Sequence, residues 1–266
     1  MMKFWKIGVY EMTLLIAIIF GAMIGSFLNV CIYRLPKGES IVSPGSHCPF
    51  CNKAIKFYDN IPILSYFLLR GKCRYCHKPI SLQYPIVEGV TALSSLLLFI
   101  RFGISFDYLF YFAFLSALIV ITVIDLYHQI IPDEISLPGI GVGLLASLIL
   151  KNITFWESLI GAISGGGSLF LVAVAYQWLF KREGMGGGDV KLLAMIGAFL
   201  GWKAVILTIL LSSLIGSIIG IAIILIKGKD FKYAIPFGPF LSLGAAISLF
   251  WGEGLIRWYL YLNTGR

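Results

Sequence analysis

The chain has 266 residues, of which 59% are hydrophobic and only 13% are charged. Soluble domains are about 45–50% apolar and about 25% charged, so this composition excludes an ordinary soluble protein and indicates one embedded in a membrane. The net charge of +8 is interpreted as a topology signal and as attraction to anionic lipid headgroups, not as nucleic-acid binding.

The apolar runs predict an all-α polytopic membrane bundle. A helix needs about 20 apolar residues to cross a bilayer, and by that length the sequence contains about eight transmembrane segments. The amino terminus could open a secretory signal, but its apolar run continues without a clear cleavage site and is interpreted as a retained first span. The predicted spans are 12–32, 86–102, 107–126, 135–150, 157–179, 189–201, 204–226 and 235–251.

A polar insert rich in Pro, Cys, Lys and Arg separates the first two spans. We therefore divide the chain into a first span at 1–33, the insert at 34–85 and a transmembrane catalytic bundle at 86–266. Lys and Arg favour the cytoplasmic side of a membrane protein. With the insert in the cytoplasm, 14 of the 21 Lys and Arg residues fall on that face and 7 on the other, which predicts this orientation.

The insert carries two Cys-x-x-Cys pairs, Cys48 with Cys51 and Cys73 with Cys76. Two such pairs about 20 residues apart have the spacing of a four-thiolate zinc site. With four protein ligands the site is closed, so a bound zinc ion is expected to be structural. A disulfide framework is the alternative, but it would require an oxidising compartment, whereas the predicted topology places the insert in the reducing cytoplasm.

Carboxylates at a membrane edge are candidates for function. Asp125 ends one long apolar run and Asp189 begins another, and the predicted topology brings both to the same face. Two close carboxylates in a site of low dielectric share a proton, so that one acts as a base on water and the other as an acid, as in aspartic proteases. Gly186 and Gly188 would allow the backbone beside Asp189 to come close to a partner. The structural alternative for Asp189 is a helix N-cap.

Three other charged residues lie near the same face and are candidate supporting or substrate-binding residues. Glu88 lies a few residues inside the second span, and Asp133 precedes the fourth, where it could serve as an N-cap. Lys191 either anchors in the lipid headgroups or faces the cavity, where we expect Glu88 to be its partner.

Six stretches together resemble the prepilin peptidases, the GxGD membrane aspartic proteases of type IV pilus and type II secretion systems. They occur in the family's order from the first span to the last. They are "GSFLNVCIYRLP" at 25–36, the two Cys-x-x-Cys pairs, "YPIVE" at 84–88, "DLYHQIIPD" at 125–133, "GMGGGDVKLLAMIGAFLG" at 184–201 and "PFGPFL" at 236–241.

The resemblance implies that Asp125 and Asp189 are the catalytic pair. It implies that the substrates are prepilins and pseudopilins, whose basic leader is cut at the cytoplasmic face of the bacterial inner membrane. Members with the four-cysteine insert generally also methylate the new amino terminus with S-adenosylmethionine. The secretion or pilus assembly machinery is a further expected partner, beside the lipid bilayer.

Two other classes of function remain open from the residues alone. A transporter could use Asp125 and Asp189 to carry protons or cations, since broken Gly-rich helices and membrane carboxylates also occur there. Such a protein often has an internal repeat, and the sequence shows none. A non-catalytic scaffold of a secretion complex would not need paired carboxylates at matched depth.

Overall fold

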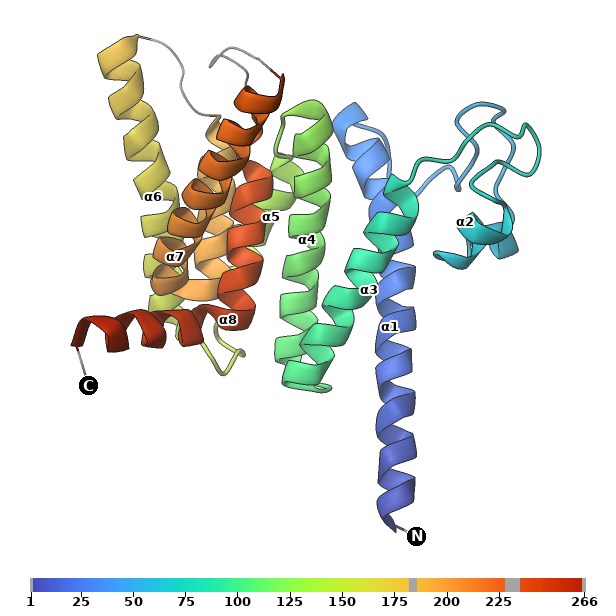
Figure 1. Cartoon of the computed structure of the whole chain (residues 1–266), viewed down its shortest axis with the longest axis horizontal. Helices are drawn as coiled ribbons and strands as arrows, with labels where there is room; N and C mark the ends of the chain where they lie inside the picture. Colours follow the sequence, from blue (N-terminus) through green and yellow to red (C-terminus); the bar gives the residue numbers. More distant parts are fainter. Residues whose placement is uncertain (1, 182–185, 228–234, 265–266) are drawn as a thin grey trace. The chain divides into compact units, whose positions relative to one another are not determined.

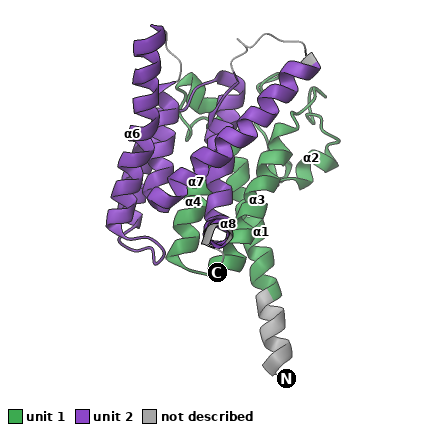
Figure 2. Ribbon diagram, turned by 60° about the vertical axis from the view of Figure 1, so that its left-hand side comes forward, with its two compact units in different colours: residues 1–120 green, residues 121–266 purple. Residues whose placement is uncertain are grey.

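The computed structural model describes residues 2–181, 186–227 and 235–264. These residues are largely helical and divide into two compact units, 1–120 and 121–266 (Figure 2). The predicted all-α fold is thereby confirmed. The predicted division into 1–33, 34–85 and 86–266 separates the insert from the spans, whereas the two compact units are defined by packing. That division stays a prediction.

Unit 1 contains the amino-terminal helix, the polar insert and the helix that follows it (Figure 1). In the insert, only short helical elements interrupt the turns and loops. In chain order, the elements of unit 1 are α1 (Met2–Arg34), η1 (Leu35–Lys37), η2 (Phe57–Asn60), α2 (Leu64–Leu68), α3 (Gln83–Phe102) and the first part of α4 (Phe106–His128).

In unit 1, α1 and α3 pack with their backbones in contact. An added Cβ at Gly21 would lie 2.7 Å from the Cα of Ala92, and one at Gly25 would lie 2.7 Å from the Cα of Glu88. Helices in lipid have little hydrophobic driving force to associate, so they depend on close packing of this kind. The "GAMIG" sequence of α1 therefore fixes where α3 lies against it.

Unit 2 contains the end of α4 and four further elements. They are α5 (Asp133–Ala146), α6 (Phe155–Phe180), α7 (Gly187–Lys227) and α8 (Gly238–Thr264). Helix α7 is broken at Gly201, whose φ of 78° and ψ of 171° are not helical. It therefore has two arms, a first arm at 187–200 that packs on α6 and a second arm at 202–227 that packs on α8.

Six helices of the described residues are long and apolar enough to cross a membrane, so the predicted number of eight needs correction. Helix α5 has 14 residues, fewer than a span needs. The predicted spans 189–201 and 204–226 form the single element α7, with the break at Gly201 between them. Each of the eight predicted segments is mainly helical, so the difference concerns length and continuity.

The first arm of α7 is the central helix of unit 2. Residues 192–199, "LLAMIGAF", are all buried. A helix that is apolar on every side is typical of a position surrounded by other helices. Asp189 precedes this buried stretch by three residues, at the start of the central helix.

Glycines set the distance between α6 and the first arm of α7. An added Cβ at Gly161 would collide with the carbonyl oxygen of Gly197, and one at Gly197 would collide with that of Gly161. Gly167 also lies on α6, but an added Cβ there would meet no atom within 4 Å. The contact between the helices therefore depends on particular glycines.

Replacing Gly197 with Ala should lower the free energy of unfolding by about 1–3 kcal/mol, because the new methyl group forces the two backbones apart. The matched change Gly167→Ala should be neutral or slightly stabilising, since Ala favours a helix and the site is open. Thermal and denaturant unfolding in detergent would measure both. Equal effects of the two substitutions would show that the glycine contact does not fix this packing.

Candidate active site

Asp125 lies in the last turns of α4 and is 5% exposed. Its Oδ2 accepts a hydrogen bond of 3.0 Å from the backbone N–H of Gly238, the first residue of α8. The first N–H groups of a helix have no partner within the helix, and they carry partial positive charge. The amino end of α8 therefore holds the Asp125 carboxylate in place.

Asp189 is the third residue of α7 and is half-buried. Its backbone N–H donates to the carbonyl oxygen of Gly186 at 3.2 Å, which closes the turn that leads into the helix. Because α7 begins at Gly187, Asp189 lies inside the first turn and not at the N-cap. The N-cap alternative for Asp189 is therefore not supported.

Ile131 connects the surroundings of the two aspartates. An added Cβ at Gly188, beside Asp189, would lie 2.8 Å from the Cβ of Ile131. An added Cβ at Gly238, which binds Asp125, would lie 3.4 Å from the Cδ1 of the same isoleucine. Unit 2 thus brings Asp125 and Asp189 to one place.

Lys191 pairs with Asp133 within unit 2, and its expected pairing with Glu88 of unit 1 stays a prediction. Its Nζ lies 2.7 Å from Oδ1 and 2.8 Å from Oδ2 of Asp133. The N-cap of α5 is Pro132, so the N-cap expectation for Asp133 was wrong. Both side chains are well exposed, and such a pair contributes about 0–1 kcal/mol to stability.

Glu88 lies in unit 1, on α3, and is 7% exposed. Its Oε2 accepts a hydrogen bond of 2.7 Å from the backbone N–H of Ile63, in the insert. One turn away on α3, the carbonyl oxygen of Tyr84 accepts a hydrogen bond of 3.2 Å from Nδ2 of Asn29, on α1. The hydrogen bond from Ile63 to Glu88 therefore fastens the insert to α3.

The four cysteines of the insert form one cluster, as predicted. The Sγ atoms of Cys48, Cys51, Cys73 and Cys76 all lie within 4.8 Å of one another, and all five cysteines of the chain are free. The Sγ atoms of Cys48 and Cys76 are 3.8 Å apart. Two thiolates on a tetrahedral zinc ion, each about 2.3 Å from it, would lie about 3.8 Å apart. The cluster therefore fits a metal ion.

Each Cys-x-x-Cys pair forms a tight turn of the same kind. The backbone N–H of Cys48 donates to the carbonyl oxygen of Lys53 at 3.0 Å, and that of Cys73 donates to the carbonyl oxygen of Lys78 at 2.9 Å. His77 lies at the bend of the second turn, where its backbone has a φ of 56°. It is not a member of the metal-binding cluster.

The backbone of the second turn favours the ionised form of Cys73. Hydrogen bonds from the backbone N–H groups of Cys76 and Tyr75 lower the pKa of the Cys73 thiol to about 7. The thiolate is the form that binds a metal, so the turn prepares this sulfur as a ligand.

Gly238 and Ile131 were not among the predicted site residues. Both lie in stretches that carry the family resemblance, but nothing in the sequence shows which residues of unit 2 meet Asp125. The N–H of a glycine at the start of a helix can bind an anion, so the glycine of "PFGPFL" was the signal in the sequence that could have pointed to Gly238. Some predicted features lie outside the described residues, namely Gly184 and Met185 of the glycine-rich motif and Arg182, Lys229 and Lys232 of the basic face.

Comparison with known proteins identifies the family. Residues 19–102 match the bacterial peptidase A24 N-terminal domain, and residues 112–221 match the type IV leader peptidase family. A protein of Aeromonas hydrophila named prepilin leader peptidase/N-methyltransferase is 39% identical over 270 residues, which cover 91% of this chain and 92% of that protein.

Proteins of the same name in two other bacteria show similar agreement. The one from Pseudomonas aeruginosa is 38% identical, over 92% of this chain and 93% of its own. The one from Legionella pneumophila is 35% identical, over 91% of this chain and 92% of its own. No solved structure matches the chain. The agreement over nearly the whole length shows that this integral membrane protein belongs to the type IV leader peptidase family.

Proposed function

We propose that the chain is a membrane aspartic endopeptidase that removes the leader from type IV prepilins and pseudopilins and then methylates the new amino terminus. The observation that carries the peptidase proposal is that Ile131 lies against both Gly188, beside Asp189, and Gly238, which binds Asp125. The names of the relatives support both activities. None of the relatives named above is a transporter or a scaffold.

The two aspartates would act as a pair that shares one proton. The ionised carboxylate takes a proton from a water molecule, which attacks the scissile carbonyl carbon. The protonated carboxyl then gives its proton to the amide nitrogen as the carbon–nitrogen bond breaks. The hydrogen bond from Gly238 keeps Asp125 in the orientation that this exchange needs.

The depth of the pair suits a substrate that is itself a hydrophobic helix with a charged leader. Asp125 ends one apolar helix and Asp189 begins another, so a bond located where the substrate helix leaves the bilayer could reach both. The excess of Lys and Arg on the insert side supports an active site on the cytoplasmic face of the bacterial inner membrane. Pilus or secretion machinery would receive the product.

The four thiolates would hold one zinc ion. A Cys₄ site leaves no open position, so the ion would supply folding free energy to the insert rather than a catalytic group. For methyl transfer we infer S-adenosylmethionine as the donor, on the strength of the relatives' name.

Replacing either Asp125 or Asp189 with Asn should reduce leader cleavage by about 10²–10⁴-fold, because the amide keeps the shape but cannot exchange the proton. The assay is mass spectrometry of a prepilin incubated with each purified variant, and thermal unfolding checks the fold. Glu253→Gln, which changes an exposed carboxylate paired with Arg257, is the control and should cleave normally. Near-wild-type cleavage by either Asp variant would remove that residue from the pair.

Gly238→Ala tests the support of Asp125. The new Cβ would lie 2.6 Å from Oδ2 of Asp125 and force the carboxylate to move. A displacement of about 1 Å can cost about 10²-fold in rate, and we expect a loss of that order. Gly254→Ala, also on α8 but in open space, should leave the rate of cleavage unchanged. Equal rates for the two variants would contradict the positioning role of Gly238.

The purified protein should contain about one zinc per chain by elemental analysis. Cys73→Ser should abolish stoichiometric zinc and lower the unfolding temperature, whereas Cys31→Ala, which changes a buried cysteine of α1 outside the cluster, should keep the metal. A metal-free wild-type protein with disulfides inside the Cys-x-x-Cys pairs would refute both the zinc site and the cytoplasmic placement of the insert.

A further inference from the structure

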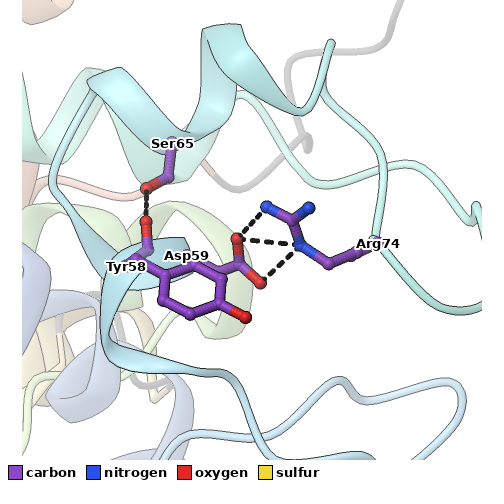
Figure 3. A network of polar contacts seen from close by, with 4 residues as sticks. All are labelled: Tyr58, Asp59, Ser65 and Arg74. Carbon is purple, nitrogen blue, oxygen red and sulfur yellow. Dashed lines mark hydrogen bonds and ion pairs between the residues drawn. The ribbon is translucent and has the colours of Figure 1, made fainter.

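The short helix α2 of the insert exposes a wholly apolar face. Leu64, Phe67 and Leu68 are 52%, 68% and 71% exposed. Residues spaced i, i+3 and i+4 lie on the same side of a helix, so the three form one surface. Ser65 is buried, and its Oγ donates to the carbonyl oxygen of Tyr58 at 3.1 Å (Figure 3). The polar contact of α2 thus holds it to the rest of the insert.

An ion pair next to this contact joins two further parts of the insert. Nε of Arg74 donates to Oδ2 of Asp59 at 2.8 Å, which joins η2 to the second Cys-x-x-Cys turn (Figure 3). The hydrogen bond from Arg74 also holds the pKa of Asp59 below its usual value, so the pair stays ionised near neutral pH. Helix α2, η2 and the cysteine turn therefore form one connected body.

A hydrogen bond from the insert to α3 sets the depth of α2. The N–H of Ile63, directly before α2, donates to Oε2 of Glu88 at 2.7 Å. Glu88 is the sixth residue of α3, a helix apolar enough to span the membrane. At 1.5 Å per residue, Glu88 lies about 7.5 Å along the helix from its start. In Figure 1, α2 is accordingly level with the first turns of α3 and lower than the loops of the insert.

The backbone is strained at Ile63, the residue that donates this bond. Its φ of 62° and ψ of −54° lie in a region that a β-branched residue rarely adopts. The N–H of Leu64 turns back to the carbonyl oxygen of Pro62, so Ile63 is the centre of a tight γ-turn. Such strain persists only where the surroundings impose it. Here the buried carboxylate of Glu88 supplies the contact that holds the turn.

We propose that α2 is an interfacial helix whose Leu64, Phe67 and Leu68 lie in the lipid leaflet around α1 and α3, at the boundary between headgroups and acyl chains. The depth set by Glu88 is the range in which interfacial helices bury their apolar side. Arg70 and Lys72 follow α2 directly and are exposed, and their charge suits the phosphates of anionic lipids. The insert is then held to the bilayer between its two ends as well as at them.

The test measures whether position 67 meets lipid or water. Full-length protein would carry trifluoromethyl-phenylalanine in place of Phe67, in nanodiscs of phosphatidylcholine and phosphatidylglycerol. The matched control is the same label in place of Phe50, which is 63% exposed in the first Cys-x-x-Cys turn. The enhancement of fluorine relaxation would be measured at each position with two paramagnetic reagents. One is dissolved oxygen, which concentrates in lipid, and the other is a gadolinium chelate that stays in water.

The ratio of oxygen to gadolinium enhancement should be several-fold higher at position 67 than at position 50. Equal ratios at the two positions would overturn the proposal. Protection of position 67 from both reagents would also overturn it, because a protein and not lipid would then cover the face.

The role of Glu88 in setting this depth is tested by two variants that carry the label at position 67. Glu88→Ala removes the acceptor for the Ile63 N–H, so gadolinium access to position 67 should rise several-fold. Glu88→Gln keeps an acceptor oxygen and should leave the ratio as in the wild type. An unchanged ratio in Glu88→Ala, with the protein folded, would show that Glu88 does not hold α2 at this depth.

Discussion

Close contact between helix backbones is the constraint on which unit 2 depends. The glycines at 161 and 197 let the first arm of α7 come against α6, and that arm carries Asp189 at its start. Gly188 and Gly238 repeat the arrangement at the site, where the lack of a side chain lets each backbone approach Ile131. In lipid, where burial of apolar surface adds little, such packing decides where a polar group comes to lie.

This constraint explains how a membrane protein can keep two carboxylates near each other. Asp125 is buried, and a buried charge needs a partner or a shared proton. The amino end of α8 provides one partner through the N–H of Gly238. The thiolate cluster lies in unit 1 and depends on different forces, namely tight turns that direct backbone N–H groups at sulfur. The two candidate sites thus belong to separate compact units.

The sequence alone predicted the features that depend on local pattern. The apolar runs are helices, and the cysteine spacing correctly predicted one cluster. Features set by tertiary contacts were harder to predict. The pairing of Lys191 with Asp133, the tie of Glu88 to a backbone N–H and the hydrogen bond from Gly238 each join segments distant in sequence. The span count differed because α5 is short and because only Gly201 separates the two arms of α7.

The central claim is that Asp125 and Asp189 cut the leader and that methyl transfer is a separate step. It is tested most directly by a protein in which both are replaced with Asn, reconstituted in lipid vesicles with S-adenosylmethionine labelled in its methyl group. Given an intact prepilin, this protein should release no leader. Given a pilin that already lacks its leader, it should incorporate label as the wild type does. Release of the leader by the double variant would contradict the account.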